Sequence, residues 1–300
     1  MRNYLIEFFE DFGYARADAD VRLAVYDRIA ENAETAACWR EMIAAYEADL
    51  NCDYDSLIKQ ADEIAERLYL HECTLELLLF ICLSRHTKAL YIERGLDLEI
   101  YHNSMLDLKY KLEECKAVRG IVGSFVAKWF PRFFGLTRFA LGRLQFELID
   151  FGFRYEKDGK VLTPESKVIN VHIPRTGTPI DQESCDAAYA QAKAFFADQI
   201  DGPIAFYCSS WMLYPENKQI LSPKSNTYRF MMQYDILESG IDKNFSNLWR
   251  LFDTDEKRWD RLPTDSFMRR AYVEHLKKGG KLGWGKGVFF AGDGRICTKI

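Results

Sequence analysis

The sequence has no Cys-x-x-Cys pair, no proline before Pro131 and no long apolar run. Its eight cysteines are scattered, most of them in apolar segments, which predicts reduced, buried thiols rather than a disulfide framework. The absence of proline permits long helices in the first part of the chain. The longest apolar run, Leu77 to Leu83, is far shorter than the roughly 20 residues of a membrane span, so we expect no membrane-spanning helix.

A large excess of charge of either sign is also missing, because the net charge is −5 over 300 residues. This mild balance gives no reason to expect nucleic acid or an anionic membrane as a partner, and it suits an anionic substrate only if a local basic patch exists. Acidic residues interrupt the apolar stretch at the N-terminus, which is untypical of a signal peptide. We therefore expect a cytoplasmic protein.

The length suggests about two domains, and the composition changes after Pro131. Apolar residues recur at helical spacing in the first part, which predicts a helical domain over residues 1–130. Asp53 or Asp55 suits the cap of one of these helices. Helix 74–95 is apolar on nearly all sides, which indicates the centre of the bundle. The helices expected here are 20–30, 35–50, 56–70, 74–95 and 98–118.

Glycine, proline and β-like runs become frequent in residues 131–300, which predicts a second domain with a mixed sheet. A strand–helix–strand order around helix 181–199 predicts a parallel crossover. The fold class is therefore α+β, a helical domain followed by an α/β domain. The expected strands are 139–151, 167–173, 203–209, 229–237, 287–291 and 295–299, and the expected helices are 181–199, 244–252 and 264–278.

Two of these strands have unusually polar faces. Alternation places Arg143, Gln145 and Glu147 on one face of the first strand, and Asn170 and His172 on one face of the second. On the same side of one sheet, these side chains form a cluster with acid, base and hydrogen-bonding capacity. The alternative is an ordinary exposed face on which the charged residues pair across strands.

The loop after the second strand leads into a helix and contains Arg175, Thr176, Gly177 and Thr178. Ligands of strand–helix–strand units bind at the carboxyl ends of the strands, and the first N–H groups of a helix attract anions such as pyrophosphate. Arg175 adds a positive charge, and Gly177 permits close approach of the backbone. The same pattern also suits a plain connection.

The third strand ends in a segment that places Ser209, Ser210 and Tyr214 at the same carboxyl edge. A tyrosine there can donate a proton to a leaving group, or it can simply pack onto the sheet. No Gly-x-Ser-x-Gly elbow is present, which disfavours a hydrolase built on His172 and a serine.

One metal-binding pattern is incomplete. His71 and Glu72 begin like a zinc-protease helix, but Leu75 stands where the second histidine belongs. We expect no metal.

Five motifs occur in order in the second half of the chain. They resemble the bacterial GNAT-like acyltransferases, which join a helical N-terminal domain to a GNAT-like C-terminal domain. The resemblance is strong over residues 139–237 and looser over the helical half. Two departures are visible: Ser209 stands where the family pattern has a histidine, and Arg175 to Thr178 match the Arg/Gln-x-x-Gly-x-Gly/Ala loop only in part. The motifs are Gly142–Glu147, Ile169–Pro174, Cys185–Asp186, Cys208–Leu213 and Ser225–Asn226.

This resemblance implies an acyl-CoA-dependent N-acyltransferase, with acetyl-CoA or another acyl-CoA as co-substrate and an amine of a small molecule or peptide as acceptor. It places the CoA pyrophosphate against Arg175 to Thr178 and the thioester carbonyl against the backbone around Ile173. Glu147 is the expected base, with His172 acting through a water, and Tyr214 is the expected acid. The residues expected to hold the acceptor or the polar cluster are Arg143, Gln145, Ser209, Ser210 and Asn226.

Two alternatives stay open. A non-catalytic protein with the same fold could sense a ligand or a partner through its helical half, and Ser209 and the partial loop match favour this reading. The aromatic segment from Phe125 to Phe139 either packs the domains together or lines an acyl pocket.

Overall fold

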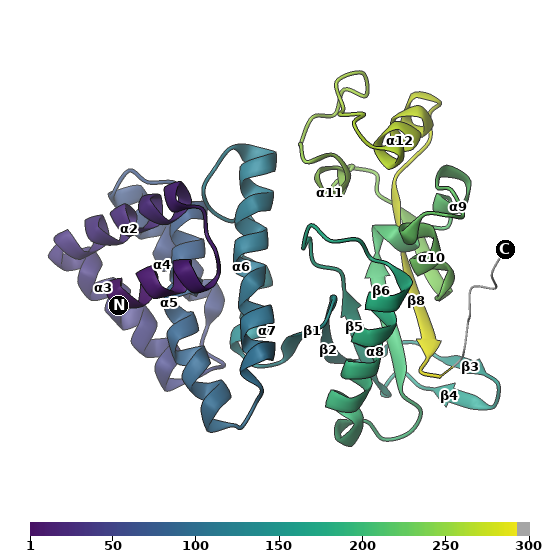
Figure 1. The fold of residues 1–300 in the computed structure, drawn as a ribbon, viewed down its shortest axis with the longest axis horizontal. Coiled ribbons are helices and arrows are strands. Elements are labelled where there is room, and N and C mark those ends of the chain that lie inside the picture. Colours follow the sequence, from purple (N-terminus) through teal and green to yellow (C-terminus); the bar gives the residue numbers. More distant parts are fainter. Residues whose placement is uncertain (293–300) are drawn as a thin grey trace. The chain divides into compact units, whose positions relative to one another are not determined.

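The computed structural model describes residues 1–292, and this part of the chain divides after Ala140 into two compact units. The expected boundary after residue 130 falls ahead of this division. The first unit is helical, as the periodicity predicts (Figure 1), and it includes one N-terminal helix that sequence analysis missed. Its helices are α1 (Arg2–Asp11), α2 (Arg16–Glu31), α3 (Ala33–Ala48), α4 (Tyr54–Arg67), α5 (Glu72–Glu93), α6 (Leu98–Arg119), the short η1 (Ala127–Trp129) and α7 (Pro131–Phe134).

Helix α5 is the centre of the helical unit, as its apolar sequence predicts. Every residue from Leu77 to Leu83 is buried, and α5 packs against α3, α4 and α6. The rings of Phe130 and Phe134 each lie 5.0 Å from that of Phe80 in α5. Part of the aromatic segment therefore belongs to the helical core. Among the helices of residues 1–292, none has both the length and the apolarity for crossing a membrane.

Polar side chains begin several helices where the sequence indicates. Asp53 Oδ1 accepts the N–H of Ser56 at 3.0 Å at the start of α4. Asp181 Oδ1 accepts the N–H of Ser184 at 2.9 Å at the start of α8 (Gln182–Phe196). Such caps satisfy backbone donors that have no partner within the helix, so they can be recognised from local sequence.

Up to residue 292, the second half of the chain forms the expected mixed sheet, with six strands in the order β1-β2-β5-β6-β8-β7 and a separate β3–β4 hairpin (Figure 1). The strands are β1 (Arg138–Leu141), β2 (Leu144–Asp150), β3 (Tyr155–Lys157), β4 (Lys160–Leu162), β5 (Lys167–His172), β6 (Ala205–Ser210), β7 (Asp235–Ile241) and β8 (Gly283–Phe290). Besides α8, the helices are η2 (Ala197–Gln199), η3 (Trp211–Leu213), α9 (Asn217–Ile220), α10 (Asn226–Met232), α11 (Leu248–Phe252) and α12 (Phe267–Lys277).

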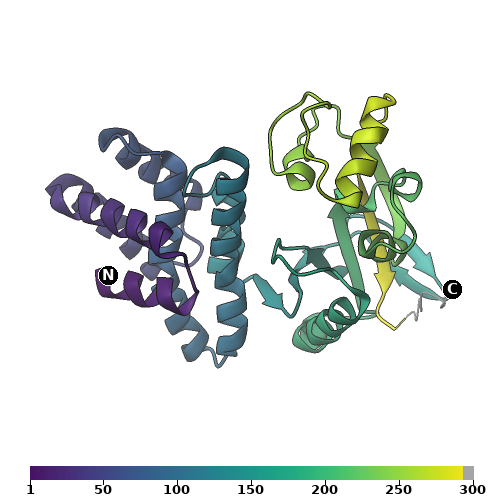
Figure 2. The ribbon, with the colours of Figure 1, turned by 45° about the horizontal axis from the view of Figure 1, so that its top comes forward.

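Strands β5 and β6 are parallel and are joined by α8, which lies on one face of the sheet (Figure 2). This confirms the expected crossover. Strand β2 pairs antiparallel with β5, and β8 lies antiparallel between β6 and β7. The carboxyl ends of β5 and β6 therefore lie at the same end of the sheet, and α8 begins at that end.

Two strand predictions were wrong in part. The run 139–151 is two strands, because the chain turns at Gly142 and Arg143. Gly142 has φ +62°, and a Cβ there would lie 3.4 Å from Ala188 of α8, so glycine permits both the turn and its close packing. The run 229–237 begins within α10, because Ser225 Oγ accepts the N–H of Tyr228 at 3.2 Å and starts a helix. The expected strand 295–299 lies outside the described residues.

Apolar cores cover both faces of the sheet. Towards α8, the ring of Phe206 lies 4.7 Å from that of Tyr189 and 5.2 Å from that of Phe289. On the opposite face, Val168 belongs to a buried cluster that includes residues beside the β3–β4 hairpin. Asn170 and His172 follow Val168 on that same face by alternation. The face thus changes from apolar to polar towards the carboxyl end of β5.

Candidate active site

A carboxylate, an amide and an imidazole meet on the neighbouring strands β2 and β5. The register places Glu147 opposite Asn170, and the buried Gln145 opposite His172. Glu147 Oε1 lies 2.7 Å from His172 Nε2 and accepts a hydrogen bond of 3.0 Å from Asn170 Nδ2. Glu147, Asn170 and His172 therefore form a polar cluster, in which Glu147 contacts His172 directly.

The short contact indicates which atom carries the proton. A distance of 2.7 Å is typical of a charge-assisted N–H···O bond, so we assign the proton to His172 Nε2, which donates to Glu147. The side chain of Glu147 is 5% exposed and that of His172 is 19% exposed. A buried carboxylate behind a more accessible imidazole fixes the orientation of the ring.

The hydrogen-bond ladder between β5 and β6 ends beside this cluster. The paired residues are Ile169 with Phe206 and Asn170 with Tyr207, although β5 runs on to His172 and β6 to Ser210. Within the described sheet, the last residues of β5 are therefore not paired with β6. Backbone N–H groups at such a position can donate to a substrate carbonyl.

Arg143 does not lie on the strand face where we expected it. It occupies the turn between β1 and β2, which takes it out of the alternation of β2. Its guanidinium donates to the main-chain oxygens of Pro174 at 3.1 Å, Thr178 at 2.9 Å and Pro179 at 3.1 Å. All three oxygens belong to the loop between β5 and α8, so Arg143 contacts the predicted phosphate loop.

The same loop places its other predicted residues close together. Gly177 has φ +78°, and Thr176 Oγ1 accepts the N–H of Thr178 at 3.2 Å. Arg175 forms a two-point ion pair with Asp253, in which Nη2 lies 2.9 Å from Oδ2. The Arg175 side chain remains 44% exposed. A guanidinium has five N–H donors, so three remain beyond the two that bind Asp253.

The beginning of α8 already holds an anion. Asp181 caps the helix, and the hydrogen bond from Ser184 N–H lowers the pKa of Asp181. Glu183 adds a second acid in the first turn. Binding of an anionic ligand at this loop therefore depends more on Arg175 and the neighbouring hydroxyl and N–H groups than on the positive end of the α8 dipole.

Tyr214 follows β6 and η3, and its side chain is buried, with 6% exposed. Burial raises the pKa of Tyr214 to about 12, and the neighbouring Glu216 contributes in the same direction. A Cβ at Gly283 would lie 2.3 Å from the Tyr214 ring, so this glycine makes room for the tyrosine. The phenol keeps its proton at neutral pH, which suits a hydrogen-bond donor.

The two serines at the end of β6 differ in environment. Ser210 Oγ accepts the N–H of Met212 at 3.2 Å and begins η3. Ser209 is exposed and lies opposite Lys286 of β8. By alternation, Ser209 shares its sheet face with His172 of the adjacent strand.

Comparison with protein-family models decides the family. The model of the GNAT-like C-terminal domain matches residues 138–289. The model of the N-acyltransferase N-terminal domain matches residues 3–136. The chain belongs to the GNAT-like acyltransferases. This confirms the resemblance that the sequence motifs indicated.

Solved acyltransferase structures share the fold of this GNAT-like acyltransferase. One, in complex with decanoyl-CoA and teicoplanin, is 19% identical, with a TM-score of 0.71 over 95% of this chain and 86% of that chain. Another, a mutant acyltransferase in complex with octanoyl-CoA, is 19% identical, with a TM-score of 0.71 over 96% of this chain and 88% of that chain. Among curated proteins, no significant match was found.

Asn226 of this acyltransferase lies at the start of a short helix. It is the first residue of α10 and follows the helix cap Ser225. Its expected role with the acceptor stays a prediction.

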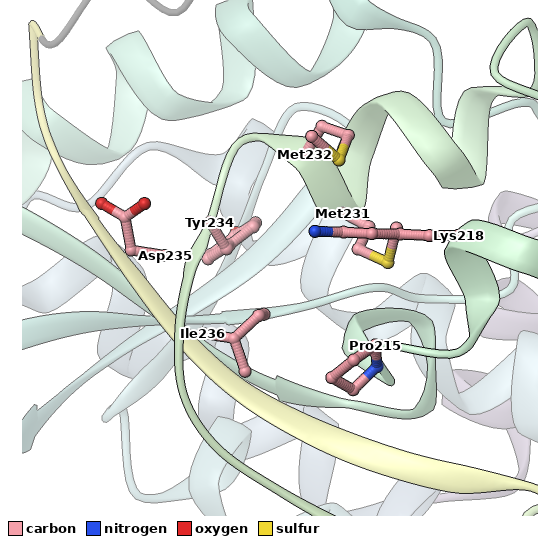
Figure 3. Close-up of a pocket in the computed structure, with 7 residues that line it drawn as sticks. All are labelled: Pro215, Lys218, Met231, Met232, Tyr234, Asp235 and Ile236. Atoms are coloured by element: carbon pink, nitrogen blue, oxygen red, sulfur yellow. The ribbon is translucent and has the colours of Figure 1, made fainter.

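A cavity of about 250 Å³ lies elsewhere in the acyltransferase, around α10 and the start of β7 (Figure 3). The lining contains none of the residues predicted for the site. The lining residues are Pro215, Lys218, Met231, Met232, Tyr234, Asp235 and Ile236.

Sequence reasoning missed Asp253, which pairs with both Arg175 and Arg269. It is 78 residues from Arg175 in sequence and lies in no recognisable motif. Asp253 ends α11 with φ +55°. The only local signal of this residue was an aspartate at the end of a helix. The ion pair itself joins residues far apart in the chain and leaves no periodic pattern in the sequence.

One group of potential metal ligands occurs in the helical unit. The ligand atoms of His71, Glu72 and Cys73 lie within 4.8 Å of one another. His71 Nδ1 accepts the N–H of Cys73 at 3.2 Å and caps α5. This capping role explains the arrangement, and we assign no metal to it.

Proposed function

We propose that this protein transfers an acyl group from acyl-CoA to an amine of a small molecule or peptide, by direct attack of the amine on the thioester. The Glu147–His172 pair beside the end of the β5–β6 ladder carries this proposal. It combines a base with backbone N–H groups that can polarise a carbonyl. Family membership supports it, as do similar acyltransferases in complex with decanoyl-CoA, octanoyl-CoA and teicoplanin.

The Glu147–His172 pair acts as the base. An aliphatic amine is mostly an ammonium ion at neutral pH and must lose a proton before it attacks. The imidazole of His172 accepts that proton, and Glu147 stabilises the imidazolium. Because Nε2 already donates to Glu147, the proton enters at Nδ1. Asn170 holds the carboxylate in place through its 3.0 Å hydrogen bond.

The thioester is polarised and cleaved beside the pair. Backbone N–H groups around Ile173 donate to the thioester oxygen as negative charge develops there. The C–N bond forms and the C–S bond breaks. The thiolate of CoA leaves and takes up the second proton, which the attacking nitrogen releases as it becomes an amide. Tyr214, whose phenol interacts with Glu216 in the structure, is our candidate donor of a hydrogen bond to the leaving sulfur. With its pKa raised to about 12, Tyr214 stabilises the thiolate more than it protonates it.

The phosphates of CoA bind at the loop that follows β5. Arg175 offers the donors that Asp253 does not use, and Thr176 and Thr178 offer hydroxyl groups. The positive φ of Gly177 lets the backbone approach the ligand. The acceptor then binds on the sheet face of His172, with the exposed Ser209 as our candidate contact and Gln145, Ser210 and Asn226 as further candidates.

Titration calorimetry and thiol release test this function. We expect acetyl-CoA, octanoyl-CoA or decanoyl-CoA to bind the purified protein, and Arg175→Ala to weaken that binding. We also expect free thiol to appear only when a reactive amine is added. Arg154→Ala is the matched control, since Arg154 is exposed at the β2–β3 connection and is 71% accessible.

Two outcomes would contradict the proposal. Binding of acyl-CoA without amine-dependent thiol release, across a panel of small amines and peptides, would indicate a non-catalytic ligand-binding protein. Failure to bind any CoA thioester would remove the donor itself from the proposal.

A further inference from the structure

One guanidinium ties together both ends of the loop between β5 and α8. Arg143 donates to the oxygen of Pro174 at the start of the loop, and to those of Thr178 and Pro179 near its end. A single planar group with several fixed donors is suited to this task, whereas a lysine ammonium presents only a point charge. The loop shape therefore depends on a residue outside the loop.

We propose that Arg143 is a positioning residue for the phosphates of the acyl donor rather than a contact for the acceptor. Carbonyl oxygens carry partial negative charge and repel phosphate. Arg143 gathers three of them, which compensates their charge and leaves the N–H groups and the side chains of Arg175 and Thr176 to meet the ligand. This inference rests on the proposed function, because it requires a donor that carries phosphates.

The turn that carries Arg143 is positioned by α8. The preceding residue is Gly142, which has φ +62°. A Cβ added at this position would lie 3.4 Å from Ala188, so the turn packs directly on α8. The loop that Arg143 binds ends at the beginning of the same helix. Arg143 therefore fixes the position of the loop relative to α8.

Two prolines make the loop suitable for such a clamp. Pro174 and Pro179 have a fixed φ, which lowers the number of conformations that the free loop can adopt. Arg143 binds the oxygen of each. A loop already held in its binding shape loses less entropy when the ligand arrives.

The test compares two donors that share a thioester but differ in phosphate. Decanoyl-CoA carries the pyrophosphate, and decanoyl-pantetheine does not. For Arg143→Ala, we expect affinity for decanoyl-CoA to fall about tenfold or more, as loss of a set of charged hydrogen bonds predicts. Affinity for decanoyl-pantetheine and the acceptor KM are expected to stay within about twofold.

Two further variants separate the explanations. Arg143→Lys should recover only part of the affinity, because one ammonium cannot reproduce the three hydrogen bonds of the fork. Arg154→Ala removes an exposed arginine of the same half of the chain and should change neither donor's affinity. The melting temperature of each variant shows whether the fold is retained.

The outcomes distinguish this inference from the proposed function. A raised acceptor KM with unchanged donor affinity would return Arg143 to an acceptor role and overturn the inference. An equal loss of affinity for both donors would indicate a merely structural role and also overturn it. A wild-type protein that binds neither donor would instead overturn the proposed function, and the inference with it.

Discussion

Substitution of Glu147 by glutamine tests the catalytic pair with little change of shape. Glutamine keeps an oxygen that can accept the proton of His172 Nε2, but it removes the negative charge. We expect slower amine-dependent thiol release with nearly unchanged affinity for acyl-CoA. The reason is that Glu147 acts on the imidazolium, which forms only as the amine loses its proton.

The size of the effect follows from the contact. A hydrogen bond to a charged group contributes about 1.5–3 kcal/mol, and a distance of 2.7 Å with only 5% of the Glu147 side chain exposed belongs to the stronger kind. At about 1.4 kcal/mol per factor of ten, the rate should fall about 10- to 150-fold. Removal of the base in His172→Gln should cost about 10²–10⁴-fold.

A double-mutant cycle measured by thiol release decides whether the two residues act together. If they form one base, Glu147→Gln should have little further effect in the His172→Gln protein. Glu238→Gln is the matched control, because Glu238 pairs with Lys286 at 2.7 Å on the same sheet but is 46% exposed. An unaltered rate in Glu147→Gln, or effects that multiply independently, would refute the pair as the base.

Three other predictions concern stability and proton donation. Tyr214→Phe should lower kcat by about tenfold, because it removes one hydrogen bond to the leaving sulfur; a loss beyond about 10³-fold would indicate an obligatory acid. Burial and the nearby Asp62 raise the pKa of Glu76 to about 8, whereas its pKa in the unfolded chain is near 4.5. The protonated side chain therefore stabilises the fold fully below about pH 4.5, and this contribution is lost as the pH rises towards 8. Thermal unfolding should therefore show that Glu76→Gln raises the melting temperature more at pH 8 than at pH 5, and an equal effect at both values would contradict this. Gly283→Ala should destabilise the protein by about 1–3 kcal/mol in denaturant unfolding, because its Cβ would lie 2.3 Å from the Tyr214 ring. Gly135→Ala, with its nearest neighbour at 3.3 Å, should cost less, and equal losses would argue against the clash.

Much of the helical half could be predicted from local sequence. Helix α5 is apolar all round and so requires neighbours on every side, and Asp53 and Asp181 cap helices through side chains only three residues from their partners. The missed start of β7 has a local explanation as well. Ser225 begins a helix in a segment whose aromatic residues also suit a strand.

Part of the polar site could be predicted from the sequence. Alternation alone places Gln145 with Glu147, and Asn170 with His172, because successive side chains of a strand point to opposite faces. Alternation cannot tell which residue lies opposite which, or how close two side chains come. The 2.7 Å contact between Glu147 and His172 exists because β2 and β5 pair in one particular register.

By itself, the sequence determined most of the long helices, a helical half followed by a half with a mixed sheet, and the strand-face pairs Gln145 with Glu147 and Asn170 with His172, since these depend on short-range periodicity and caps. Only the tertiary structure decided what the arginines do. Arg143 leaves its strand at a glycine turn and binds a loop about 30 residues away, and Arg175 pairs with Asp253, 78 residues distant. Contacts over such separations depend on how the chain closes in space, and local sequence carries no record of that closure.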